Sequence, residues 1–150
     1  MSVRVEAAGL GLPDVFMCGR RIIGPTLFQN QCGGLAETCL MSAAMSFEIV
    51  DGMRSEEAAG FFIPYQTAWV GLVHRAKLTP DDTTLVLGAS GSSGCAAVQL
   101  AKAVGARVIA VAGGAEKSAF CKSLGADAVI DHRQEDITSA ARELTEGKGV

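Results

Sequence analysis

Apolar and polar positions in the second half of the chain alternate in blocks that predict strands and helices in strict succession. Short apolar runs are typical of buried parallel strands, and the segments between them repeat with helical periodicity. The predicted strands cover residues 85–87, 107–112 and 128–130, and the predicted helices cover residues 95–104, 116–124 and 137–144. Gly105 and Gly125 are placed to cap the first two helices, and Asp136 is placed to begin the third.

This order of elements predicts the α/β class. Three strand-helix pairs in a row form one mononucleotide-binding half of a doubly wound (Rossmann) parallel sheet. Val129 and its neighbours, in the last of these strands, are expected to need a further strand or a partner at the edge of the sheet.

The glycine-rich segment Gly88-Ala-Ser-Gly-Ser-Ser-Gly94 joins the first strand to a helix expected to start near Gly94. Such a turn holds phosphate, because backbone N–H groups point out of it and the positive end of the helix dipole lies behind them. Ala89 stands where G-x-G-x-x-G usually has its first glycine, Gly91 would let a pyrophosphate approach, and Gly94 would let the helix pack closely. The residues predicted to bind cofactor here are Ala89, Gly91, Ser92, Ser93 and Gly94.

The end of the second strand indicates which dinucleotide fits. An NAD site usually has an acidic residue there for the ribose 2′-hydroxyl, whereas this chain continues with Gly113 and Gly114. Lys117 follows and could reach a 2′-phosphate as a point charge. Glu116 argues the other way, unless it points to solvent and complements the helix dipole. The sequence therefore favours NADPH over NADH.

Two further candidates follow the third strand, His132 and Arg133. Ligands of open α/β sheets bind at the carboxyl ends of strands, so both side chains are predicted to face the cofactor. The alternative for His132 is a surface loop histidine. Arg133 would add a second positive charge near the 2′-phosphate or, alternatively, face water.

Composition argues against nucleic acid and membrane as partners, and the first residues indicate the cellular compartment. A net charge of −3 argues against nucleic acid, whose phosphates require basic surfaces. No apolar run approaches the ~18 residues of a membrane helix. The first residues do not have the layout of a signal peptide, which predicts a cytoplasmic protein.

The five cysteines have an odd count and no C-x-x-C spacing, which predicts reduced thiols. Cys32 and Cys39 flank a Gly-Gly pair, but a tetrahedral metal site needs more ligands than these two. Cys95 and Cys121 are expected to pack as small apolar residues. No metal site is predicted.

Several segments together resemble the zeta-crystallin-like quinone oxidoreductases, the zinc-free branch of the medium-chain dehydrogenases/reductases. They are the turn 88–94, Ala-Val-Gln-Leu-Ala-Lys at 97–102, Gly-Ala-Arg-Val-Ile-Ala at 105–110, residues 123–133 and 144–150, and upstream Glu-Glu-Ala-Ala at 56–59 and Tyr-Gln-Thr-Ala at 65–68. The resemblance covers nearly the whole chain and is more specific in its second half.

The resemblance implies three regions: an incomplete GroES-like β domain at residues 1–54, connecting helices at 55–79 and the first half of the Rossmann domain at 80–150. The family's asparagine near Gly11 and its tyrosine after the Gly19 region are both replaced. Residues 21–24 resemble a later strand of the family's β domain, yet they directly follow Gly19 and Arg20, so the resemblance implies that the strands between are missing. We therefore expect an internally deleted chain that is also truncated after Val150, before the nicotinamide half.

The function that the resemblance implies is NADPH-dependent, zinc-independent hydride transfer to a quinone or an enone. Thr67 corresponds to a possible nicotinamide contact, while Trp69 is expected to serve in packing and His132 to meet the adenosine side. Two alternatives remain open: a non-catalytic dinucleotide-binding fragment, and an interaction module that forms a homo-oligomer through its open sheet edge. Whether residues 1–150 are themselves an enzyme is uncertain at this stage, because half of the cofactor site is missing from them.

Overall fold

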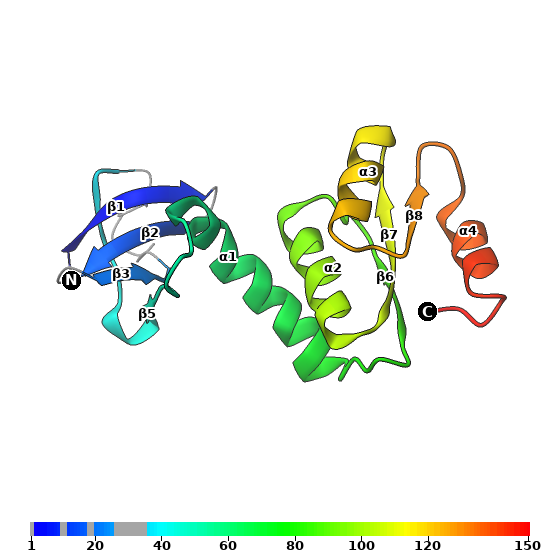
Figure 1. Cartoon of the computed structure of the whole chain (residues 1–150), viewed down its shortest axis with the longest axis horizontal. Helices are drawn as coiled ribbons and strands as arrows, with labels where there is room; N and C mark the ends of the chain where they lie inside the picture. Colours follow the sequence, from blue (N-terminus) through cyan, green and yellow to red (C-terminus); the bar gives the residue numbers. More distant parts are fainter. Residues whose placement is uncertain (1, 10–11, 18–19, 26–35) are drawn as a thin grey trace. The chain divides into compact units, whose positions relative to one another are not determined.

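The computed structural model describes residues 2–9, 12–17, 20–25 and 36–150. The chain divides into two compact units, Met1–Ile63 and Pro64–Val150 (Figure 1). The division falls inside helix α1, Ser55–Ala68, so this helix contributes to both units.

The first unit is built on a five-stranded antiparallel sheet with the strand order β4-β1-β2-β3-β5. Arg4 pairs with Phe16 and Gly9 with Leu12 along β1 and β2, with an irregularity between Val5 and Ala7. The strands are β1 Ser2–Gly9, β2 Leu12–Met17, β3 Arg20–Ile23, β4 Thr38–Leu40 and β5 Phe47–Glu48, and a short 3₁₀ helix spans Ala43–Met45.

Helix α1 contributes to the core of this unit. Ile23, Ile49 and Ala58 are buried together, and Met53 and Phe62 pack against them. Polar contacts add to this core, because the Arg21 guanidinium donates to the backbone oxygen of Met53 at 2.6 Å and to Ser55 Oγ at 2.9 Å.

The second unit contains a three-stranded parallel sheet in the order β6-β7-β8. The elements alternate along the chain as β6 Thr83–Val86, α2 Ser92–Val104, β7 Arg107–Ala112, α3 Ala115–Ser123, β8 Ala128–Asp131 and α4 Ile137–Leu144. This arrangement confirms the predicted α/β class and the partial parallel sheet.

Helices cover both faces of this sheet, α2 and α3 on one face and α4 on the other (Figure 1). Successive side chains of a strand point to opposite faces. Val108 and Ala110 of β7 are accordingly buried with Val98 of α2, whereas Ile109 of β7 is buried with Ala140 of α4. Burial on both faces explains why β7 has a continuous apolar sequence.

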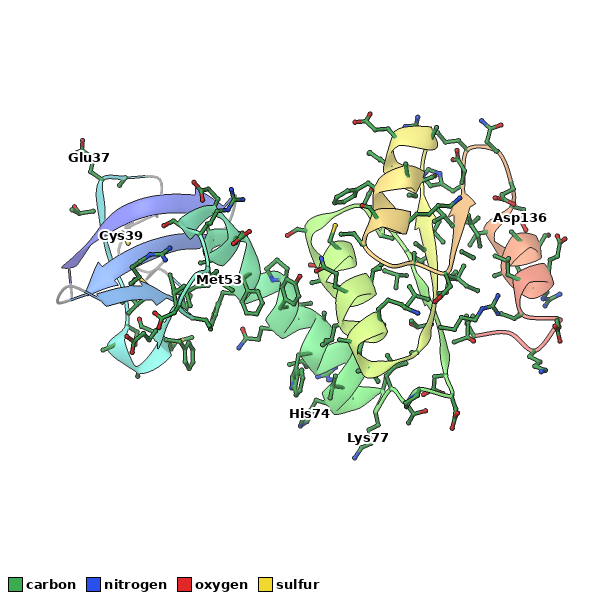
Figure 2. All side chains as sticks on the ribbon, in the orientation of Figure 1. Glu37, Cys39, Met53, His74, Lys77 and Asp136 are labelled. Atoms are coloured by element: carbon green, nitrogen blue, oxygen red, sulfur yellow. The ribbon has the colours of Figure 1, made fainter. Side chains whose placement is uncertain are left out.

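The predicted helix ends are confirmed at three positions. Gly105 and Gly125 have φ values of +98° and +101°, the left-handed conformation that glycine adopts without strain after a helix. Asp136 Oδ1 accepts a 2.9 Å hydrogen bond from the Ser139 N–H and caps the start of α4 (Figure 2).

The largest differences from the predicted bounds are the start of α2 and the two ends of β6, which covers 83–86 rather than 85–87. Helix α2 begins at Ser92 with Gly91 as its N-cap, three residues before the expected start, so Gly94 lies inside the helix. The two serines carry no apolar periodicity, and pattern alone therefore places them in the turn. Strand β6 ends at Val86, and Leu87 is 65% exposed in the turn that follows.

The connecting helices expected at residues 55–79 change their hydrogen-bond pattern midway. A π-helical stretch, Trp69–Arg75, follows α1 directly and ends where the Ala76 N–H donates to the Gly71 oxygen at 3.0 Å. His74 is exposed near the end of this stretch (Figure 2). Of the helices in the described ranges, none combines the length and the apolar character needed to cross a bilayer.

Candidate functional site

Three loops meet at the carboxyl edge of the parallel sheet: residues 87–91 after β6, 113–114 after β7 and 132–136 after β8. Two hydrogen bonds fasten the outer loops to β7. The Ala89 N–H donates to the Val111 oxygen at 3.0 Å, and the His132 N–H donates to the Ala112 oxygen at 3.2 Å. The middle strand therefore sets the relative positions of all three loops. This edge is where open α/β sheets bind their ligands.

The first loop exposes hydrogen-bond donors at the N-terminus of α2. Gly88 has a φ of +62°, and the Gly91 N–H closes the turn onto the Gly88 oxygen at 2.9 Å. The first bond within the helix is from the Cys95 N–H to the Gly91 oxygen. Within the described part of the chain, no acceptor lies on the N–H groups of Ser92, Ser93 or Gly94, and Gly91 offers no capping side chain. These donors and the helix dipole form a site that favours an anion.

The two glycines of this loop have different surroundings. A Cβ atom on Gly94 would collide with the Gly88 carbonyl oxygen and lie 2.7 Å from the Cα of Ala89, which is itself fully buried. A Cβ atom on Gly91 would meet only the Gly88 oxygen, at 3.3 Å. Gly94 is therefore required for the close contact between helix and turn, while Gly91 keeps the outer side of the turn open.

The second and third loops meet at Gly113. A Cβ atom there would stand 2.7 Å from His132 Nε2 and 3.0 Å from Arg133 Nε. On Gly114 it would stand 3.4 Å from Arg133 Nη1. The structure thus brings His132 and Arg133 together with the glycine turn, and both side chains are exposed above it.

Asp131, which sequence reasoning did not single out as a site residue, connects these two loops. Its Oδ1 accepts 3.0 Å hydrogen bonds from the N–H groups of Gly114 and Arg133. These two hydrogen bonds, first the one from Gly114 and then the one from Arg133, are the main reason why the pKa of Asp131 lies below its ordinary value. The sequence signal is an aspartate that ends a buried strand directly before His132 and Arg133.

The remaining predicted residues lie on helices. Lys117 and Glu116 are neighbours in the first turn of α3 and both are exposed. Ser118 fixes that turn, because its N–H and hydroxyl both donate to the Gly114 oxygen at 3.0 Å. Thr67 is exposed on α1, which forms none of the three loops.

The described residues contain no group of three or more histidine, cysteine or acidic side chains that could hold a metal ion. Cys39 and Cys121 are buried and Cys95 is half-buried, and none of the three forms a disulfide within the described residues. Burial raises the pKa of Cys95 and Cys121, and Cys121 on α3 packs in a core formed with α2 and β7. Cys18, Cys32, Gly11 and Gly19 lie outside the described residues.

Comparison with known proteins identifies the family. Residues 94–150 match the family model described as zinc-binding dehydrogenase. The quinone oxidoreductase-like protein 2 homolog of Nematostella vectensis is 39% identical over 133 residues, which are 88% of this chain and 35% of that protein. The chain is a quinone oxidoreductase-like member of the medium-chain dehydrogenase/reductase family.

Two solved structures superpose on nearly the whole chain. The quinone oxidoreductase of Thermus thermophilus, which was also solved in complex with NADPH, has a TM-score of 0.84 and 29% identity over 96% of this chain and 54% of its own. The CurK enoyl reductase has a TM-score of 0.79 and 29% identity, covering 93% of this chain and 43% of its own. The chain thus spans between about a third and just over half of the length of these relatives.

Proposed function

We propose that this chain carries the adenosine side of the cofactor site of an NADPH-dependent, zinc-independent oxidoreductase that acts on a quinone or an enone. One observation carries the proposal. Three loops converge at the carboxyl edge of a parallel sheet, and the first of them presents N–H groups of Ser92, Ser93 and Gly94 that have no acceptor among the described residues.

The loops fit the parts of a dinucleotide. The N-terminus of α2 offers backbone donors and a positive dipole end to the pyrophosphate, and the open side of Gly91 allows it to approach. Gly113 and Gly114 provide a turn without side chains, beside which an adenosine ribose would lie. Both features follow from this chain's own backbone.

Charge near that turn supports NADPH over NADH. Residues 112–115 include no carboxylate that could accept from a ribose 2′-hydroxyl. The Arg133 guanidinium lies against Gly113 and Gly114, and Lys117 adds a second cation in the first turn of α3. Asp131 ends β8 beside this turn, but backbone N–H groups already occupy one of its oxygens. The cations of Arg133 and Lys117, together with an Asp131 carboxylate that is already hydrogen-bonded, suit a 2′-phosphate.

The reaction itself would be a hydride transfer, and a bound nicotinamide dinucleotide would supply the hydride. The residues of this chain would bind and orient the adenosine end, and Thr67 stays a proposed nicotinamide contact. An acceptor with an electron-poor carbon, either a quinone or an enone, is supported by the relatives described above, one a quinone oxidoreductase and another an enoyl reductase. Zinc independence and a cytoplasmic location likewise remain proposals.

Calorimetric titration of the 150-residue chain with NADPH and with NADH tests the cofactor assignment. We expect binding of both and a clear preference for NADPH. Equal dissociation constants would refute the assignment to NADPH, and the absence of any binding would refute the dinucleotide site. A turnover assay with one quinone and one enone, carried out with and without a zinc chelator, tests the reaction class.

A second candidate function is dinucleotide binding without catalysis. The observation that favours it is that the described parallel strands form one mononucleotide half, whereas the nicotinamide belongs to the other half of such folds. Binding of NADPH without measurable turnover would support this second function.

A further inference from the structure

One carboxylate oxygen holds two of the three loops in place. Asp131 Oδ1 accepts from Gly114, which immediately precedes α3, and from Arg133 in the loop after β8. The backbone of Asp131 also holds this loop. Its carbonyl oxygen accepts from the Gln134 N–H at 2.9 Å, and its N–H donates to Glu135 Oε1 at 3.2 Å.

These bonds determine where the cation of Arg133 lies. The Arg133 N–H is fixed on Asp131, and its guanidinium returns toward Gly113 and Gly114. His132 is fixed at its own N–H by the Ala112 oxygen, and its imidazole also reaches Gly113. Without Asp131 Oδ1, the Gly114 turn and the Arg133 backbone would lose their common hydrogen-bond acceptor, and both would be freer to move.

We propose that Asp131 is a positioning residue that sets the preference for a 2′-phosphorylated adenosine, because it holds Arg133 and the Gly113–Gly114 turn in register. This inference rests on the proposed function. Asp131 makes no contact with the nucleotide in this proposal. It acts through Arg133, whose guanidinium is the group suited to a phosphate.

Three variants separate this role from general stability. Asp131→Asn keeps a carbonyl oxygen for the two N–H donors and removes the charge, whereas Asp131→Ala removes both. Asp136→Ala is the matched control. Asp136 is an exposed aspartate that likewise accepts two hydrogen bonds, from the N–H and hydroxyl of Ser139 at 2.9 Å each, but it caps α4 on the other face of the sheet.

The probes are adenosine 2′,5′-bisphosphate and adenosine 5′-monophosphate, titrated calorimetrically into the full 150-residue chain. We expect Asp131→Ala to weaken the bisphosphate about tenfold, the loss expected for one charge-assisted hydrogen bond, and to change the monophosphate little. We expect Asp131→Asn to restore the bisphosphate affinity, and Asp136→Ala to leave both affinities unchanged. Amide hydrogen exchange without nucleotide should be faster at Gly114 and Arg133 in Asp131→Ala only.

The other possible results would overturn either the positioning role of Asp131 or the proposed function. If Asp131→Ala binds the bisphosphate as the parent does, or weakens both probes equally, the positioning role is wrong and the proposed function stands. If Asp131→Asn fails to restore binding, the carboxylate charge matters rather than the held geometry, which also overturns the inference. If the parent binds neither probe, the proposed function fails and the role of Asp131 in recognition fails with it.

Discussion

The imidazole of His132 lies directly over Gly113, with Nε2 only 2.7 Å from the point where a Cβ atom on that residue would stand. Gly113→Ala would therefore push against the ends of His132 and Arg133, both of which can move into solvent. We expect weaker NADPH binding with little change in the midpoint of thermal unfolding. Calorimetry and a thermal melt on the same samples measure the two effects. A variant with parental affinity would show that these side chains do not bind the nucleotide.

Gly91 and Gly94 form a matched pair for the phosphate turn. Gly91→Val places a branched side chain where the pyrophosphate is proposed to lie, but meets only the Gly88 oxygen, so the fold should survive while NADPH binding is lost. Gly94→Ala forces the helix away from Gly88 and Ala89, with an overpacking cost of about 1–3 kcal/mol in the free energy of unfolding. Urea unfolding and NADPH titration of both variants measure this contrast. Undiminished binding by Gly91→Val would mean that the site lies elsewhere.

Lys117 offers a direct test of cofactor choice. Replacing it with glutamate exchanges an exposed cation in the first turn of α3 for an anion, beside a proposed 2′-phosphate. We expect Lys117→Glu to weaken NADPH and leave NADH nearly unchanged, so that the preference falls or reverses. Lys122→Glu, near the other end of α3, is the control for net charge. If the two variants lower NADPH affinity equally, the effect of Lys117 is a general electrostatic one.

Asp127 should make stability depend on acid pH. Its Oδ2 accepts from the buried Val108 N–H at 2.7 Å and from Lys102 Nζ at 2.9 Å, and these hydrogen bonds, with the positive charges of Lys102 and Arg107, lower its pKa in the folded chain. Because the folded pKa lies below the unfolded value of about 3.9, the contribution is complete above that pH and is lost as the pH falls through the folded pKa.

The measurement is the free energy of unfolding in urea between about pH 3 and 7, for the parent and for Asp127→Asn. The difference between the two should be constant near neutral pH and shrink toward the acid end. Near neutral pH, removal of the charged acceptor should cost roughly 1–2 kcal/mol. A difference that does not change with pH would show that the Asp127 charge makes no contribution.

How far the sequence predicts this structure depends on the range of the interactions. Strand β7 has the predicted bounds, because a strand buried on both faces requires a continuous run of apolar residues. The capping roles of Gly105 and Asp136 were also predictable, since each depends on residues within one turn of it. The π-helical stretch after Ala68 was not, because a shift of one residue in hydrogen bonding leaves the same residues on a helix.

The candidate site shows the same limit more clearly. The loops that hold it were predicted because each follows a recognisable strand. The contact of His132 and Arg133 with Gly113 joins residues far apart in the sequence and depends on the register of β7 with β8. The bond from Gly114 to Asp131 depends on that register too, which is why Asp131 was missed as a site residue.

The 150-residue chain by itself is expected to bind the adenosine end of NADPH and to reduce quinones slowly or not at all. Its described parallel strands make one mononucleotide half, and hydride transfer needs the nicotinamide held close to its acceptor, so loose placement costs orders of magnitude in rate.

Both β6 and β8 are outer strands of the described sheet, and unpaired strand edges promote association. In the doubly wound order the fourth strand pairs beside the first, so the edge at β6 should associate more readily than the edge at Val129 in β8. Sedimentation of the purified chain, compared with a Thr83→Pro variant that removes an N–H facing away from β7, tests the association, and a quinone reductase assay on the same fractions tests the rate. A monomeric chain that turns over quinone at an ordinary enzymatic rate would refute both expectations and would show that residues 1–150 assemble a complete site.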